Sequence, residues 1–501
     1  MKYGSISTGS KEASETALEI LKFGGNAFDA AVGAIFVSMT SEFALTGVFG
    51  GGTLLGVENN SKPFAYDFFV DCPDCISNHK KDFKEIEINF GNAKQKFNIG
   101  KGSIAIPGNL IGLIKIQKKY GRLKLKDVLS YGIDCAANGV IINQNQSDII
   151  NLVKPILQYE ENGKNLYSYN NRFLKTGDLF KNYQFADFLN IVLKKGYKYF
   201  YEGNGLDNIL FHCGNDSYIN KNDFKSYKVK KRTPISINFH NHDIFTNPAP
   251  SFGGSLIIFL LKLLRDSNKK INLKNLIQAM NLTSLARQEV CFNPDDEYQI
   301  NTIFNKDIYN KYLDFNTKNI SNPENGFGST THVSVLDNKG NIASITTTNG
   351  EGCGYVIPEY GIMMNNMLGE EDLNPFGFHK WRIKRRLPTM ISPTIISENN
   401  RPKYVLGSGG SNRIRSANIQ VILNLLINNM NLSDAIKESR VHLEGKILYA
   451  EPGIKNLNKN DLNDFYLTQF KDKNVFFGGV NAVSSKEAIG DNRRGGYGII
   501  L

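Results

Sequence analysis

The chain has 501 residues, of which 41% are hydrophobic and 21% are charged. These are ordinary values for a folded globular protein and exclude global intrinsic disorder. The 59 Lys and Arg residues outnumber the 48 Asp and Glu residues, which gives a net charge of +11. The basic residues form only short clusters, at 228–232 and 379–386, so we do not expect a nucleic-acid partner.

No apolar run reaches the length of about 18 residues that a membrane span requires. The first residues, 1–7, also lack the apolar core of a signal segment. We therefore expect a soluble cytoplasmic protein without a membrane partner.

Six cysteines are too few for a disulfide scaffold in a chain of this length. Residues 72–75 form a C-x-x-C motif, but no second pair and no histidines follow at zinc-finger spacing. We expect thiols in a loop here, with no metal and no cofactor.

The first part of the chain alternates helix and strand patterns. Apolar residues at helical spacing predict a helix over 11–22, and Asn26 is placed to cap a second helix over about 27–38. A glycine run then leads into a predicted strand over 53–57, and a further helix is expected over about 109–119.

The middle of the chain, from 123 to about 280, has a mostly helical pattern. A loop at 248–255 opens a helix that is expected to run to about 264, and strand patterns dominate after residue 329. No repeat or low-complexity linker divides the chain, so we expect one layered unit of helices and strands.

Residues 328–350 carry the clearest chemical pattern. Apolar and polar residues alternate around Val333, as in a half-buried strand. A three-residue loop at 338–340 that ends in a left-handed glycine pairs the two flanking strands so that Thr330 lies opposite Thr348. Opposed residues point to the same face, with Cβ atoms about 5 Å apart.

This arrangement has a chemical use. A threonine hydroxyl is a weak nucleophile until a base removes its proton, and an α-amine, with an ordinary pKa of about 7.7 to 8.0, can be that base if Thr330 becomes a chain terminus. The Thr348 hydroxyl could then orient the amine or the nucleophilic oxygen. The hairpin by itself leaves open a threonine-rich hairpin without catalytic function.

A second segment, 404–416, has the pattern of a strand, a glycine turn and a helix. Backbone N–H groups at such a turn can bind a developing oxyanion. The spacing lacks the lysine of a P-loop and the third glycine of a dinucleotide loop. A phosphate loop or a simple tight turn stays open as an alternative.

Taken together, five segments in the right order make the chain similar to the γ-glutamyltranspeptidase family of N-terminal-nucleophile hydrolases. These segments are 24–32, 248–254, Thr330-Thr331-His332, 407–413 and Arg493-Arg494-Gly495-Gly496. The resemblance implies an α+β fold, a four-layer αββα sandwich.

The resemblance also implies self-cleavage between Ser329 and Thr330 by an N→O acyl shift. The products would be a large subunit, 1–329, and a small subunit, 330–501, which stay associated as one structural domain. A homodimer of that pair is also considered.

The implied catalytic residues are the nucleophile Thr330, its partner Thr348, and Gly409 and Gly410 as oxyanion donors. The residue matching the family's arginine for the glutamyl α-carboxylate is Phe69, which cannot make that bidentate pair.

Other substrate-binding positions also depart from the family. The asparagine expected two residues after Thr348 is Gly350, and the polar residues expected after Asn366 begin with Met367. The two serines expected near 388 are Pro388 and Thr389.

Three residues remain as predicted substrate contacts. Glu370 could bind a substrate amine, and Thr389 keeps a hydroxyl at one serine position. Arg413 is a candidate for an alternative anion site, as are Arg385, Arg386 and Arg415, and Trp381 could cover the pocket or act as a core anchor.

The leading hypothesis is a self-processing threonine amidohydrolase or acyltransferase that acts on γ-glutamyl or related amide bonds of a small molecule or peptide. The alternatives are an acylase or a poly-γ-glutamate-cleaving relative with a different acyl donor, and an unprocessed, non-catalytic scaffold.

Overall fold

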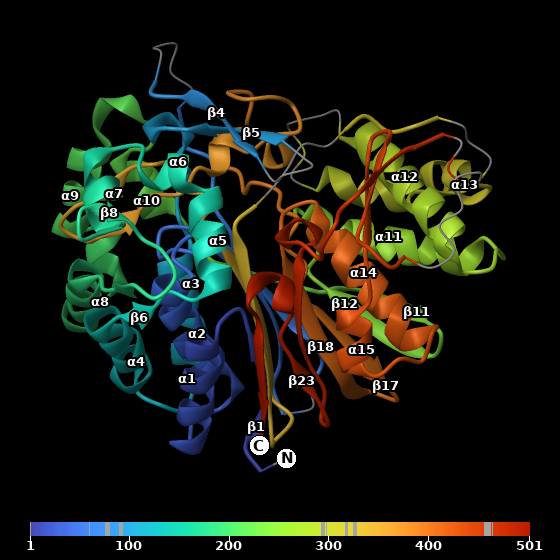
Figure 1. The fold of residues 1–501 in the computed structure, drawn as a ribbon, viewed down its shortest axis with the longest axis horizontal. Helices are drawn as coiled ribbons and strands as arrows, with labels where there is room; N and C mark the ends of the chain where they lie inside the picture. The colour runs from blue at the N-terminus through green and yellow to red at the C-terminus, as the bar shows by residue number, and fades with distance from the viewer. Residues whose placement is uncertain are drawn as a thin grey trace.

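Two antiparallel sheets lie face to face at the centre of the molecule, and helices cover the outer face of each (Figure 1). The computed structural model describes residues 2–59, 61–75, 81–89, 94–291, 296, 298–315, 319–323, 328–454, 462 and 464–501. Apolar side chains from both sheets, among them Leu55, Leu336 and Val405, form the core between them. The predicted four-layer αββα sandwich is therefore confirmed.

The first sheet has the strand order β10-β3-β2-β14-β13-β1-β24 and the second has the order β11-β12-β17-β18-β22-β23. The strands of the first sheet, in that order, are Lys230–Arg232, Phe64–Phe68, Gly51–Val57, Ile342–Thr348, Thr330–Asp337, Gly4–Thr8 and Tyr497–Ile500. Those of the second are Ile235–Phe239, His242–Thr246, Thr394–Glu398, Arg401–Gly409, Gly479–Val483 and Ala488–Ile489.

Small sheets pair the remaining described strands: β4 with β5, β6 with β9, β7 with β8, β15 with β16, and β19 with β20 and β21. Their bounds are, for β4 to β9, Lys84–Asn89, Lys94–Ile99, Val140–Ile141, Ser168–Tyr169, Arg172–Phe173 and Leu179–Phe180; for β15 and β16, Val356–Ile357 and Ile362–Met363; and for β19 to β21, Val441–Glu444, Ile447–Ala450 and Tyr466–Gln469.

Helices α1 to α10 lie on the side of the first sheet, and α11 to α15 lie on the side of the second (Figure 1). In chain order they are Lys11–Lys22, Ala27–Ser41, Asn109–Tyr120, Leu125–Asn138, Gln144–Leu152, Lys154–Leu157, Glu161–Leu166, Tyr183–Lys195, Asn204–Cys213, Lys221–Ser226, Phe252–Asp266, Leu273–Val290, Lys306–Leu313, Arg413–Leu426 and Leu432–Lys437.

Helix α2 is buried along its whole length against the first sheet. Asn26 and Asp29 form a capping box at its start, as predicted for Asn26. The Asp337 carboxylate, from the end of β13, also accepts the Ala27 N–H at 3.1 Å. The turn of the β13–β14 hairpin is thereby fixed to the first turn of α2.

The predicted register of that hairpin is confirmed. Thr330 pairs with Thr348, and the Asp337 N–H donates to the Asn341 carbonyl at 3.0 Å. Gly340 has a φ of 79°, the left-handed conformation that the three-residue loop requires. The two threonines therefore lie side by side at the open end of the hairpin.

The stretch 123–280 is mostly helical, as predicted, and the short strands β6 to β12 lie between its helices. Two of these, β11 and β12, are joined by His240 and Asn241, both with positive φ. A two-residue turn of this kind matches the twist of a hairpin.

Candidate active site

The hairpin places two hydroxyls at one buried strand end. Thr330 begins β13 and is 4% exposed, and Thr348 ends β14 and is 6% exposed. The Thr348 hydroxyl donates to the carbonyl oxygen of Ser329 and accepts the Gly350 N–H at 3.0 Å. The peptide bond before Thr330 is thus polarised by a neighbouring hydroxyl.

The predicted glycine turn reaches the same place. Strand β18 ends at Gly409, and a Cβ atom there would lie 2.1 Å from the Thr330 carbonyl oxygen. Gly410 follows with a φ of +120°. Only glycine allows this approach of the turn to the nucleophile strand.

A pocket surrounds Thr330 and Thr348. Its other lining residues are Phe69, Gly328, Met367, Glu370, Asp372, Leu373, Thr389, Met390, Ile391, Ser411 and Ile414. The structure thus brings together four of the predicted site residues, with the glycine turn directly beside them. Of the described residues that line this pocket, none is Lys, Arg or His.

Three carboxyl groups lie close together beside the nucleophile. Glu351, Glu370 and Asp372 are each at most 5% exposed. Burial, followed by the negative charge of the neighbouring carboxylates, raises the pKa of Glu351 and of Glu370 well above the ordinary value. Burial also raises the pKa of Asp372, although the Ser411 hydroxyl donates to it and partly offsets this shift.

Sequence reasoning missed Glu351 and did not single out Asp372. Glu351 follows the hairpin and accepts the Ser329 N–H at 2.9 Å. The preceding residue, Gly350, has a φ of +63°, and a Cβ atom there would lie 1.9 Å from the Asn366 side-chain oxygen. The departure from the family at Gly350 is the sequence signal that could have pointed to this turn.

Phe69 lines the nucleophile pocket, as its predicted position requires. The nearby Arg386 does not replace the missing arginine there. Its guanidinium lies 3.2 Å from Asp71 and 3.4 Å from Asp67, and it donates to the Phe69 carbonyl oxygen. Arg386 is therefore held as a buried support beneath Phe69.

The prediction that Arg413 contacts substrate is not supported by its position. Arg413 is 1% exposed and does not line the pocket of Thr330. Its guanidinium lies 4.2 Å from the centre of the Phe476 ring and 3.8 Å from the Glu444 carboxylate. From the first turn of α14 this side chain packs on Phe476, and it acts on the pocket residue Asp372 only through its charge.

Thr389 lines the nucleophile pocket, and its hydroxyl accepts the Ile391 N–H at 3.2 Å. Trp381 is 6% exposed and lines a neighbouring pocket together with Arg385 and Pro388. Trp381 does not line the pocket of Thr330, and it packs in a buried apolar cluster with Leu373 and Leu387, as the core-anchor alternative expects.

His332 is buried, and its ring contacts hydroxyl groups of the same hairpin. Its ring nitrogens lie 2.7 Å from the Thr346 hydroxyl and 2.8 Å from the Ser334 hydroxyl. Burial lowers the pKa of His332 to about 3, so the ring is neutral at ordinary pH.

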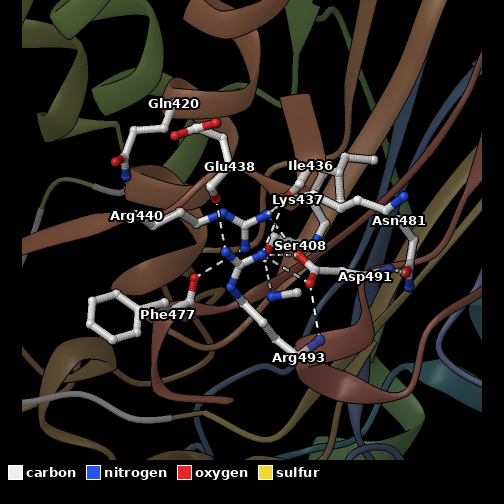
Figure 2. A network of polar contacts seen from close by, with 12 residues as sticks. Ser408, Gln420, Ile436, Lys437, Glu438, Arg440, Phe477, Asn481, Asp491 and Arg493 are labelled. Carbon is white, nitrogen blue, oxygen red and sulfur yellow. Dashed lines mark hydrogen bonds and ion pairs between the residues drawn. The ribbon is translucent and has the colours of Figure 1, made fainter. Parts of the chain in front are cut away.

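The last of the five family segments, 493–496, is fixed by a buried network of charges. In this network the side chains of Arg440 and Arg493 converge on Asp491 (Figure 2). Arg493 also pairs with Glu451 at 2.6 Å. The network holds the chain just before Arg494. The Arg494 guanidinium lies beside the glycine turn, because a Cβ atom built at Gly410 would be 3.0 Å from it.

Within the described part of the chain, no three His, Cys, Asp or Glu side chains are grouped so as to hold a metal ion. Cys72 is buried and Cys75 is exposed, and both are free thiols. No described helix is both long enough and apolar enough to cross a membrane.

An αββα sandwich with a threonine at the start of a central strand defines the class of N-terminal-nucleophile hydrolases. Residues 13–500 match the gamma-glutamyltranspeptidase family. The chain belongs to this family, as the five segments predicted.

Relatives of known name are similar over nearly the whole chain. The capsule biosynthesis protein CapD proenzyme of Bacillus anthracis is 27% identical over 99% of this chain and 90% of its own length. The glutathione hydrolase proenzyme of Escherichia coli is 26% identical over 88% of this chain and 81% of its own length. Cephalosporin acylase from Bacillus halodurans has a similar fold, with a TM-score of 0.82, 19% identity, and coverage of 99% of this chain and 96% of its own.

Proposed function

We propose that the protein is a self-processing threonine amidohydrolase or acyltransferase that acts on γ-glutamyl or related amide bonds. Thr330 is the nucleophile, first on its own chain and then on substrate. The observation that carries this proposal is the hydroxyl of Thr348, which faces Thr330 and donates to the Ser329 carbonyl.

Maturation begins with attack of the Thr330 hydroxyl oxygen on the Ser329 carbonyl carbon. The new C–O bond forms, the C–N bond breaks, and the hydroxyl proton moves to the departing nitrogen, which becomes the α-amine of Thr330. Water then hydrolyses the ester. Charge that develops on the carbonyl oxygen during attack is stabilised by the Thr348 hydroxyl.

The cleaved chain would form subunits 1–329 and 330–501 that stay associated, because both sheets contain strands from each. In the first sheet, β1 of the large subunit lies between β13 and β24 of the small subunit. In the second sheet, β12 of the large subunit pairs with β17 of the small subunit.

In turnover, the free α-amine of Thr330 takes the hydroxyl proton as the oxygen attacks the substrate carbonyl. The N–H groups of Gly409 and Gly410 bind the oxyanion, and the leaving amine takes a proton. The resulting ester on Thr330 is released by water or by an amine acceptor. Glu370 and Thr389 line the same pocket and would contact the acyl group.

One observation favours an acylase with a different acyl group as the second candidate. Phe69 stands where the family's carboxylate-binding arginine is expected, and no basic residue lines the described pocket. An acyl donor without a carboxylate would suit such a pocket better than glutathione.

A denaturing gel of the purified protein, with the Thr330→Ala variant beside it, tests the proposal. The wild type should give two bands, at about one-third and two-thirds of the mass, and the variant should stay full-length and inactive because it lacks the hydroxyl. Thr330→Ser should still cleave. An intact, inactive wild type would favour the scaffold alternative, and normal cleavage of Thr330→Ala would place the nucleophile elsewhere.

A further inference from the structure

The residue before the proposed cleavage site is held by both of its backbone polar groups. Ser329 is 1% exposed, its N–H donates to Glu351 Oε1 at 2.9 Å, and its carbonyl oxygen accepts the Thr348 hydroxyl. Both side chains come from the end of one hairpin, three residues apart. The N–H belongs to the peptide unit before Ser329 and the carbonyl belongs to the unit after it, so the two contacts fix the backbone on both sides of the Ser329 Cα and thereby the direction of the carbonyl.

The turn that carries these two side chains is itself fixed. The Gly350 N–H donates to the Thr348 hydroxyl at 3.0 Å, and the Glu351 N–H donates to the Asn366 side-chain oxygen at 2.9 Å. A side chain at Gly350 would collide with Asn366 and with Glu370. The turn therefore aims Glu351 at Ser329 by its backbone geometry.

The second oxygen of the Glu351 carboxyl, Oε2, is buried and has no hydrogen-bond partner among the described residues. Burying a carboxyl group in this state beside two other carboxyls is costly. The other oxygen, Oε1, accepts the Ser329 N–H, whereas Asp372 and Arg494 act on the carboxyl group through their charges. The hydrogen bond described for this side chain is therefore directed at the cleavage site.

We propose that Glu351 is the positioning residue for self-cleavage, which holds the Ser329 N–H so that the neighbouring carbonyl faces Thr330. This inference rests on the proposed function, since it requires Thr330 to attack the Ser329 carbonyl. Glu351 forms and breaks no bond in the step: the proton still moves from the Thr330 hydroxyl to the Thr330 nitrogen. Its carboxyl oxygen only accepts a hydrogen bond, whether the group is protonated or ionised.

The test is the rate of self-cleavage, followed on denaturing gels after synthesis of the full chain. Glu351→Ala should cleave about tenfold more slowly, because it leaves the buried Ser329 N–H without its acceptor. Glu351→Gln should recover most of the rate, because the amide oxygen still accepts the N–H. Glu289→Gln is the matched control, since this carboxylate contacts Lys311 and Tyr312 on the outer helices, and it should not change the rate.

A second set of variants separates positioning from folding. Ser329→Pro removes the N–H and should slow cleavage, and adding Glu351→Ala to it should slow cleavage little further. Thermal unfolding of Glu351→Ala should match that of the uncleaved Thr330→Ala chain.

Normal cleavage of Glu351→Ala would overturn the inference while leaving the proposed function intact. Equal loss in Glu351→Gln, or full additivity with Ser329→Pro, would overturn it as well. A wild type that does not cleave would overturn both.

Discussion

The substrate pocket gives the sharpest prediction about specificity. The resemblance to the family implies an arginine that binds the α-carboxylate of a glutamyl substrate. Phe69 lines the pocket at that position, beside Glu370 and Asp372. Arg386, which donates to the Phe69 carbonyl oxygen, is already paired with Asp67 and Asp71. The α-carboxylate of a γ-glutamyl donor would therefore lie near carboxyl groups, and none of the described residues that line the pocket carries a positive charge.

The magnitude follows from the missing contact. A hydrogen bond to a charged group contributes about 1.5 to 3 kcal/mol, which is roughly tenfold to more than a hundredfold in kcat/KM. In an enzyme with the arginine, removing the donor's α-carboxylate should lose about that factor. Here the loss should be absent, so the 4-aminobutanoyl anilide should react as fast as the γ-glutamyl anilide or faster.

The assay compares kcat/KM of the processed wild type on three anilides: γ-glutamyl, 4-aminobutanoyl without the carboxylate, and glutaryl without the amine. Glutaryl anilide should be the poorer of the last two, because Glu370 lines the pocket and is the residue proposed to bind the substrate amine. Phe69→Arg alone should restore little for the γ-glutamyl donor, since Gly350, Met367 and Pro388 also depart from the family.

Efficient turnover of glutathione, on the order of 10⁵ M⁻¹s⁻¹ or above, would refute this reasoning. A tenfold or larger drop on removing the carboxylate would refute it too. Either result would mean that another residue binds the carboxylate.

Three further predictions follow from the buried groups around the site. Thr348→Ala should slow self-cleavage by about a hundredfold, as the loss of one oxyanion donor does, and Thr348→Ser should be milder; an unchanged rate in the alanine variant, read from gels, would exclude this role. His332 has a pKa of about 3 in the folded chain and about 6.5 in the unfolded chain, so between these pH values only the unfolded chain binds a proton there. The free energy of unfolding should therefore fall by about 1.4 kcal/mol for each unit by which the pH is lowered in this range. Urea unfolding of His332→Gln in the uncleaved background should lack this part of the loss. Arg493→Met leaves Glu451 and Asp491 buried without that partner and should cost about 3 to 5 kcal/mol of unfolding free energy, whereas a cost below about 1 kcal/mol would show that the network in Figure 2 is dispensable.

The hairpin at the site could be predicted from the sequence because its register is a local property. The loop length and Gly340 decide which residues face each other, so Thr330 and Thr348 are paired by counting alone. The capped start of α2 was predictable for the same reason, since the Asn26 side chain bonds N–H groups two and three residues away.

What the sequence could not give are contacts between segments far apart in the chain. The pairing of Arg413 with Glu444 depends on how β19 packs beside α14. The sequence therefore shows that Arg413 is positively charged, but it does not show where the Arg413 side chain points. The fixation of Arg386 by Asp67 is of the same kind, because the two residues lie on segments more than three hundred positions apart.

Glu351 is a different case. It lies close to Thr348 in sequence, but its direction depends on the left-handed backbone at Gly350 and on the Asn366 side chain. The pattern of family departures marked Gly350 as a lost asparagine, and the structure shows that the turn it allows brings a carboxyl group to Ser329.

The central claim is that Thr330, made a chain terminus by cleavage, carries the acyl group. The most direct measurement traps the processed enzyme with a slowly hydrolysed amide donor and locates the added mass by peptide mapping. The account predicts the acyl mass on the first residue of the small subunit, Thr330, and none in the Thr330→Ala chain. An adduct on another residue, or a small subunit that begins at a different position, would contradict it.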